Sequence, residues 1–247
     1  EKIMSYHVLL TGHEGYVGSH LTKALAERDV IVGTFHGDLL DVDWEKQEKK
    51  FDMVIHLAGL AGVRRSFKEP QEYYKNNVEL SRRIFKYCER TRTEVVYASS
   101  SNAHEWWLNP YATTKQMIEE MASMLSVKHI GMRFHTVWPG REDMLYKRLQ
   151  KGAVDYVNED HFRDWIHIED LCNAICTIVQ KCYIIDQSVV DVGTGHVTPV
   201  AQLAKKFDFK GEWRSGEAPG ERMATRADID YLLALGWTPE HNIMNEG

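Results

Sequence analysis

Residues 6–19, YHVLLTGHEGYVGS, decide the fold of this 247-residue chain. The apolar run 6–11 has the pattern of a buried strand that ends at a glycine. A helix is predicted directly after it over 16–27, because Val17, Leu21 and Leu25 recur at helical spacing. A strand, a glycine loop and a helix in this order are typical of the first unit of a dinucleotide-binding domain.

The three glycines of this loop have separate physical tasks. Gly12 permits the tight turn, Gly15 lets the backbone approach a pyrophosphate, and Gly18 lets the helix pack on the strand. The first N–H groups of the helix and the positive end of its dipole then face the phosphates. The loop therefore predicts a dinucleotide cofactor bound at the start of the chain.

Strand and helix signals alternate through the first two-thirds of the chain. Strands are expected at 6–11, 30–35, 53–57, 95–98 and 130–134, and helices at 16–27, 71–89, 111–125 and 170–180. The strands are apolar throughout, as in a parallel sheet that is covered on both faces. The sequence thus predicts an α/β fold with a Rossmann-like, doubly wound parallel sheet.

Beyond about residue 136 the alternation loosens, which predicts a small C-terminal substrate lobe interleaved with the last strands. We expect residues 1–135 plus about 163–192 to form the dinucleotide-binding part. Residues from about 136 to 162 plus 193–247 are expected to form the lobe. Arg163 and Asp164 are expected to make a structural ion pair at the junction.

Composition excludes several classes of protein. The formal net charge is −6, without the basic excess of a nucleic-acid binder. No apolar run approaches the roughly 20 residues of a membrane span, and the four cysteines form no Cys-x-x-Cys pair. The twelve histidines form no metal-ligand spacing, so no metal is expected. We expect a cytoplasmic protein that binds neither nucleic acid nor membrane.

A catalytic pair follows the predicted strand at 95–98. Tyr111 and Lys115 are four residues apart at the start of a helix, so they share one helix face. A nearby ammonium favours the phenolate, which would let Tyr111 exchange a proton with a substrate hydroxyl. Ser100, at the end of the strand, is expected to hydrogen-bond the same oxygen. The order of these groups indicates a hydride-transfer site.

The second strand lacks the acid that usually holds the cofactor ribose. It ends at Thr34-Phe35-His36, and Asp38 is the nearest carboxylate. NAD is the expected cofactor, and NADP is not excluded.

These motifs resemble the extended short-chain dehydrogenases/reductases of the NAD-dependent epimerase/dehydratase family. The likeness covers nearly the whole chain, from the glycine loop through His56-Leu57-Ala58-Gly59 to Leu235-Gly236-Trp237-Thr238-Pro239. The resemblance implies that the cofactor is held by Gly12, Gly15, Tyr16, Val17, Gly18, Asp38, Leu39, Leu57, Ala58, Gly59, Asn77, Lys115 and Phe134.

Within the family, the sequence is similar to the UDP-glucuronate 4-epimerase branch. Tyr111-Ala112-Thr113-Thr114-Lys115 resembles its Y-A-A-T-K, and residues 133–137 and 140–144 resemble its R-F-F-T-V and G-R-P-D-M. The resemblance implies substrate contacts from Ser101, Thr136, Arg141, Arg222 and Arg226. In relatives the helices that correspond to 71–89 and 111–125 form a dimer, so a homodimer is expected.

The expected reaction is therefore epimerisation of a nucleotide sugar at carbon 4, through a transient keto sugar. An NADP-dependent keto-sugar reductase is the main alternative, because the turn from the second strand to Asp38 is compact. A dehydratase or decarboxylase is disfavoured, since such relatives carry an acid where this chain has Ser101-Asn102. A binding protein without turnover would be expected to lack Tyr111 or Lys115.

Overall fold

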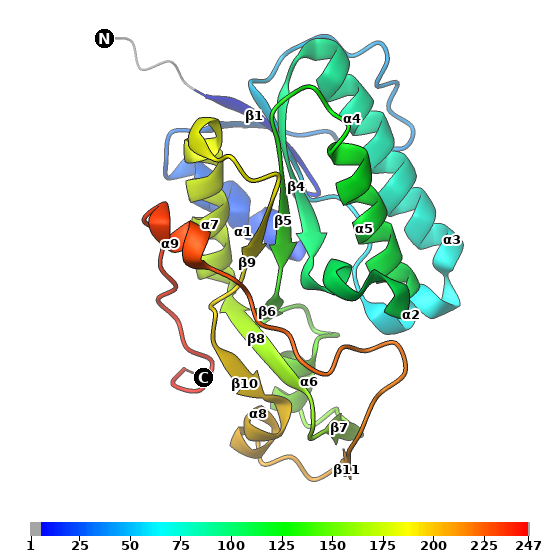
Figure 1. Ribbon diagram of the computed structural model, residues 1–247, viewed down its shortest axis with the longest axis vertical. Helices are drawn as coiled ribbons and strands as arrows, with labels where there is room; N and C mark the ends of the chain where they lie inside the picture. The colour runs from blue at the N-terminus through cyan, green and yellow to red at the C-terminus, as the bar shows by residue number, and fades with distance from the viewer. Residues whose placement is uncertain (1–5, 247) are drawn as a thin grey trace.

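A computed structural model of the protein describes residues 6–246. Its centre is a parallel sheet of six strands in the order β2-β1-β3-β4-β5-β9 (Figure 1). The strands are β1 (His7–Thr11), β2 (Ile31–Gly33), β3 (Met53–His56), β4 (Glu94–Ser100), β5 (His129–Phe134) and β9 (Val189–Val192). The expected Rossmann-like fold is confirmed.

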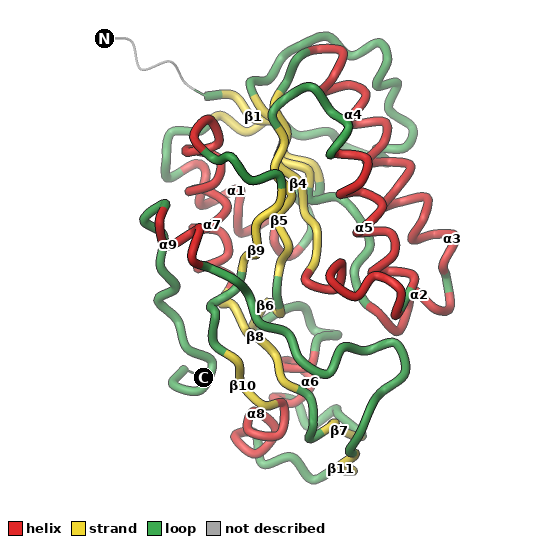
Figure 2. The backbone as a smooth tube through the Cα atoms, viewed as in Figure 1, coloured by secondary structure: helices red, strands yellow, loops and turns green. Residues whose placement is uncertain are grey.

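Helices cover both faces of the sheet, as a sheet of continuous apolar strands requires. One face packs against α1 (Tyr16–Ala26), α7 (Ile168–Lys181) and α9 (Asp230–Ala234), and the other against α4 (Leu80–Thr91) and α5 (Pro110–Ala122) (Figure 2). Alternate residues of one strand enter different cores: Val8 and Leu10 face α7, whereas Leu9 faces α4. No helix within residues 6–246 is long and apolar enough to span a bilayer.

The second strand is short and lies at the edge of the sheet. It ends at Gly33 rather than at residue 35, and residues 34–52 contain neither helix nor strand. Trp44 anchors this connection, because its buried ring packs in the core beneath α4 and its indole N–H donates to the Leu39 carbonyl over 2.9 Å. Residues 34–52 therefore form a loop along the edge of the sheet that lies next to the expected cofactor site.

The helix expected over 71–89 is interrupted. It consists of α3 (Pro70–Tyr73), a π-helical segment (Tyr74–Glu79) and α4. Such π-turns insert a residue into an α-helix and often occur at functional sites. Here the π-turn contains Asn77, whose side chain points into the protein.

The C-terminal lobe lies beyond the carboxyl ends of the parallel strands (Figure 1). Its own core contains Trp138, Trp165 and Leu203. It is built from β6 (Thr136–Trp138), α6 (Leu145–Gln150), β7 (Tyr156–Asn158), β8 (Phe162–His167), β10 (Val197–Pro199), α8 (Val200–Lys206) and β11 (Glu212–Arg214). Three short elements remain: α2 (Val63–Lys68), the 3₁₀ segments η2 (Ser101–Leu108) and η3 (Cys182–Ile184).

The division into a dinucleotide-binding part and a lobe stays a prediction, and residues 1–5 of the first part lie outside the described residues. Two details differ from the expected boundaries. The strand β8, expected from residue 163 onward in the dinucleotide-binding part, pairs with β6 and β10 of the lobe. Leu232, Leu235 and Trp237, expected in the lobe, pack in the core of the main sheet beside α7. Their apolar side chains cover the α7 side of the main sheet, where the chain returns from the lobe.

Asp164 organises the junction between the sheet and the lobe, but the expected ion pair with Arg163 is wrong. The fully buried Asp164 carboxylate accepts hydrogen bonds from the backbone N–H groups of Thr194, Gly195 and Ala227 at 2.7, 2.8 and 3.0 Å. Arg163 faces Glu221 at 4.0 Å instead. Successive side chains of a strand point to opposite faces, which separates these two neighbours.

Replacing Asp164 by alanine is expected to lower the free energy of unfolding by about 3 kcal/mol or more, because three buried N–H donors lose a charged acceptor. Urea unfolding at pH 7 measures the change. The exposed Asp155→Ala variant is the control and should stay within about 0.5 kcal/mol of the parent. Equal stability of the two variants would contradict this role of Asp164.

Candidate active site

The glycine loop leaves a surface made of backbone at the start of α1. Gly12 has a φ of +74°, and a Cβ there would stand 2.7 Å from the Ala58 nitrogen. A Cβ on Gly18 would overlap the Gly12 carbonyl oxygen. Gly15 closes the turn by donating its N–H to that oxygen over 3.0 Å. The residues present thus fit a dinucleotide diphosphate held by backbone N–H groups.

A buried hydrogen-bond chain fixes the loop that follows β3. The His56 ring contacts the Thr11 hydroxyl at 2.7 Å through Nδ1 and the Ser81 hydroxyl at 2.9 Å through Nε2. Burial, and then the positive charge of Lys115, lower the pKa of His56 to about 3, so the imidazole is neutral. The chain links β1, β3 and α4 behind the expected cofactor residues Leu57, Ala58 and Gly59.

Asn77 holds this loop against α5. Its side-chain oxygen accepts from the Leu60 N–H at 2.7 Å, and its amide donates to the Leu60 carbonyl and to the Thr114 hydroxyl at 3.1 and 3.0 Å. Both amide hydrogens are therefore used within the protein. Asn77 thus ties the loop after β3 to α5, and its expected contact with the cofactor stays a prediction.

The structure brings Tyr111, Lys115 and Ser100 together at the carboxyl end of β4. Asn109 caps α5 by accepting from the Ala112 N–H at 2.7 Å, and this cap fixes Tyr111 in the first turn. The Lys115 ammonium donates to the Ala98 carbonyl at 2.8 Å and lies 6.0 Å from the centre of the Tyr111 ring. All three side chains are buried, in a region that can exclude water from a reacting oxygen.

The pKa values of this pair reflect burial. Burial raises the pKa of Tyr111, and the hydrogen bond with Ser100 and the charge of Arg141 act in the opposite direction. Burial thus outweighs the favourable groups around Tyr111, and the expected net lowering of the tyrosine pKa is not found. Burial lowers the pKa of Lys115 to about 8, so the ammonium is still charged at neutral pH.

Two side chains from other elements approach Tyr111. The Tyr73 ring packs edge-to-face against it, with ring centres 6.1 Å apart, and donates its hydroxyl to the Ala61 and Gly62 carbonyls. Arg141 pairs with Asp143 at 2.9 Å. Its side chain is 42% exposed, so a second anion can still reach the guanidinium. The expected substrate residue Thr136 begins β6 and is half-buried.

The C-terminal connection reaches back to η2, the segment that follows β4. Arg222 donates to the Ser101 carbonyl at 2.7 Å and pairs with Glu105 at 3.2 Å, so it braces η2 from 121 residues away in the chain. Arg226 is exposed and donates to the Gly195 carbonyl at 3.1 Å. Of these two expected substrate residues, Arg222 contacts η2, the segment that follows Ser100, whereas Arg226 contacts the loop at Gly195.

Buried charges that the sequence analysis missed lie beneath this segment. Glu119 on α5 pairs with Arg133 on β5 at 2.6 Å and accepts from Ser99. Burial alone would raise the pKa of Asp191, but hydrogen bonds from His104 and His135 hold it well below its ordinary value. The sequence positions of these residues do not predict the pairs, because the partners lie on different strands and helices that only the fold brings together.

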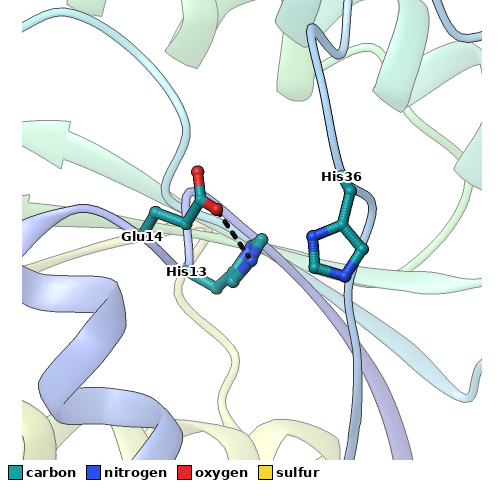
Figure 3. Close-up of side chains that lie close together, drawn as sticks. All are labelled: His13, Glu14 and His36. Atoms are coloured by element: carbon teal, nitrogen blue, oxygen red, sulfur yellow. Dashed lines mark ion pairs between the residues drawn. The ribbon is translucent and has the colours of Figure 1, made fainter.

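Two imidazoles stand where the ribose-binding acid was missing (Figure 3). His36 follows β2, and its ring centre lies 5.7 Å from that of His13 in the glycine loop. The His13 Nε2 atom is 3.9 Å from the Glu14 carboxylate. Asp38 is exposed, and its carboxylate accepts from the Leu40 N–H at 2.9 Å, which stabilises the turn. The adenosine end of the expected cofactor site therefore presents imidazoles.

The fold also assembles histidine groups that the sequence spacing did not predict. Ligand atoms of His13, Glu14 and His36 lie within 4.8 Å of one another, as do those of His167, Glu169 and His241. The His167 and His241 rings are stacked 4.1 Å apart at 29°.

The remaining expected cofactor residues line the same edge of the sheet. Tyr16 begins α1, and its hydroxyl accepts from the Gly140 N–H at 3.1 Å, which joins the glycine loop to the lobe. Val17, Leu57 and Phe134 pack on the main core and are half-buried. Leu39 packs on the opposite core beside Trp44.

Comparisons with known proteins agree with this geometry. A sequence model of the NAD dependent epimerase/dehydratase family matches residues 8–193. The UDP-glucose 4-epimerase of Yersinia enterocolitica is 30% identical over 81% of each chain. Protein CapI of Staphylococcus aureus is 28% identical over 70% of this chain and 69% of its own.

Solved structures have the same architecture. MoeE5, solved with UDP-glucuronic acid and NAD, is 26% identical with a TM-score of 0.81, over 96% of this chain and 95% of its own. The UDP-glucuronic acid 4-epimerase of Bacillus cereus, at 20% identity, has a TM-score of 0.82 over 97% of this chain and 96% of its own. At that identity the likeness is one of fold.

Proposed function

Because the chain belongs to the NAD-dependent epimerase/dehydratase family, we propose that it is an enzyme that epimerises a UDP-glucuronate-like nucleotide sugar at carbon 4. The proposal rests on the groups around Ser100 and Tyr111, where Glu105 and Glu119 are not free to act as a second acid. Ser100 lies beside Tyr111 and lowers its pKa, whereas Glu105 and Glu119 are each paired with an arginine. Epimerisation through a keto sugar moves one proton at one oxygen, and loss of water or carboxylate would need a further group.

The residues of the chain divide the work. Tyr111 takes the proton of the 4-hydroxyl as the carbonyl forms and returns it afterwards, while Ser100 donates a hydrogen bond to the same oxygen. Lys115 contributes a buried positive charge beside the phenolate. The NAD cofactor supplies a reversible acceptor for the hydride of carbon 4. Arg141, close enough to affect the pKa of Tyr111, is suited to the carboxylate of a uronic acid.

Conversion of UDP-glucuronate tests this proposal. Purified protein with added NAD is incubated with the sugar nucleotide, and the configuration at carbon 4 is followed by proton NMR. Appearance of UDP-galacturonate is expected. Absence of conversion while NAD still binds would overturn the substrate assignment.

The imidazoles at the adenosine end keep one alternative open, an NADP-dependent keto-sugar reductase. A carboxylate at the end of β2 repels a 2′-phosphate, and His13 and His36 do not. If the reductase reading is correct, keto sugars will be reduced with net consumption of NADPH. An epimerase consumes none.

His36→Asp is therefore expected to change cofactor discrimination. In the parent protein the Kd for NADP should be within about tenfold of that for NAD, and the variant should raise this ratio at least about tenfold by charge repulsion. Titration calorimetry measures both constants, and the exposed His196→Asp variant controls for added charge. An unchanged ratio in His36→Asp would show that His36 does not contact the ribose.

The homodimer also remains a proposal, with α4 and α5 as its interface. Met121 of α5 packs on the core, whereas Met117 of α5 is 36% exposed and Met124, two residues beyond the end of α5, is 78% exposed. Exposed apolar side chains on a helix are suited to a partner subunit. Light scattering after gel filtration measures the mass of the assembly, and a monomer across micromolar concentrations would refute the interface.

A further inference from the structure

Asn102 is the side chain that contacts the catalytic serine without an assigned role. Its backbone N–H and its side-chain amide both donate to the Ser100 hydroxyl oxygen, each over 3.2 Å. A serine hydroxyl has two acceptor positions and one proton. With both acceptor positions engaged by Asn102, Ser100 has only its proton left to give.

We propose that Asn102 is a positioning residue, which directs the Ser100 proton toward the oxygen shared by Tyr111 and the substrate. The inference rests on the proposed function and adds a residue to it. An amide at this place donates to Ser100, whereas a carboxylate would accept from Ser100 and turn the hydroxyl away. Asn102 itself touches neither Tyr111 nor the reacting oxygen in this role.

Contacts of the residues around Asn102 keep its side chain in position beside Ser100. Arg222 holds the neighbouring Ser101 carbonyl at 2.7 Å, and Thr113 of α5 donates to the Trp106 carbonyl at 2.9 Å. The segment η2 is thus fixed at its start by the C-terminal connection and at its end by the catalytic helix. A short segment fixed at both ends confines the direction of the amide.

The consequence for Tyr111 follows from the groups that face it. Its hydrogen bond with Ser100 opposes the effect of burial on its pKa, Tyr73 from α3 adds to that effect, and Arg141 from the lobe opposes it. Lys115 stands on its own helix, 6.0 Å from the ring centre. If the Ser100 proton is turned away, the phenolate loses a donor and the tyrosine titrates at higher pH.

Asn102→Asp tests this directly, because it replaces the amide donor by an acceptor of the same size. In the pH profile of kcat/KM with UDP-glucuronate, the ascending limb should move up by about one pH unit, a roughly tenfold loss at pH 7 that recovers at higher pH. Asn102→Ala, which keeps the backbone donor, should move it less. Asn245→Asp, in the exposed C-terminal segment, adds the same charge and should leave the limb in place.

A spectroscopic titration separates this inference from the proposed function. The ultraviolet absorbance of tyrosinate, recorded for the NAD-loaded protein and corrected with Tyr111→Phe, reports the ionisation of Tyr111 without any substrate. A higher midpoint in Asn102→Asp supports the inference even if UDP-glucuronate is not converted. An unchanged midpoint, or a loss of activity equal at all pH values, would overturn it. If Asn102→Asp fails to fold, the same comparison with Asn102→Ala decides.

Discussion

Tyr111→Phe is expected to lower kcat for conversion of UDP-glucuronate by about 1000-fold, because the site then has no group that accepts the proton of the sugar hydroxyl. Ser100 and Lys115 remain, so binding should persist. The Kd for NAD is expected to stay within about threefold of the parent value, since the phenol hydroxyl is proposed to face the substrate. Coupled NMR and calorimetric measurements on one preparation give both numbers.

Tyr73→Phe is the matched control. It removes the hydroxyl of the tyrosine that packs against Tyr111, and that hydroxyl donates only to the Ala61 and Gly62 carbonyls among the described contacts. Loss of these bonds should lower stability by about 1–2 kcal/mol and change kcat less than about fivefold. If the two variants lost activity equally, Tyr111 would have no special part in proton transfer.

Lys115→Met is expected to change activity and stability in opposite directions. Removal of the ammonium should lower kcat/KM at least about 100-fold, since the phenolate loses its buried counter-charge. The same change should raise the free energy of unfolding at pH 7 by about 1–3 kcal/mol. The reason is that the pKa of Lys115 falls from 10.5 to about 8 on burial, so folding at neutral pH carries the cost of a desolvated ammonium.

The destabilising contribution of Lys115 is expected to depend on pH. Because the pKa of the folded protein is depressed, the unfavourable contribution of Lys115 is present in full below pH 8 and disappears as the pH rises toward 10.5. The stability difference between Lys115→Met and the parent should therefore narrow between pH 7 and pH 10 in urea unfolding. The exposed Lys205→Met variant should show neither effect. A variant that is less stable than the parent at pH 7 would contradict the account.

Much of this site could be predicted from sequence, since its residues stand at the ends of consecutive strands. Gly12 follows β1, Gly59 follows β3 and Ser100 ends β4, and parallel strands bring their carboxyl ends to one edge. Tyr111 and Lys115 needed only helical periodicity. Local patterns and the topology of a parallel sheet thus carry the cofactor loop and the proton-transfer set.

Contacts between segments distant in the chain were beyond the sequence. Arg222 reaches the carbonyl of Ser101, and Asp164 binds the N–H groups of residues 194, 195 and 227, through loops whose paths follow no periodicity. The direction of the Tyr111 pKa was also missed, because the extent of burial depends on packing by Tyr73 and the lobe. Trp237 joined the main core although its segment follows the lobe.

The central claim is that hydrogen leaves carbon 4 as hydride and returns to the same carbon, while Tyr111 moves only the hydroxyl proton. UDP-glucuronate labelled with deuterium at carbon 4 tests this most directly, when it is converted in ordinary water with NAD and the product is examined by NMR and mass spectrometry. The account predicts UDP-galacturonate that keeps nearly all of its deuterium at carbon 4. Product in which the deuterium has been replaced by solvent hydrogen would contradict it.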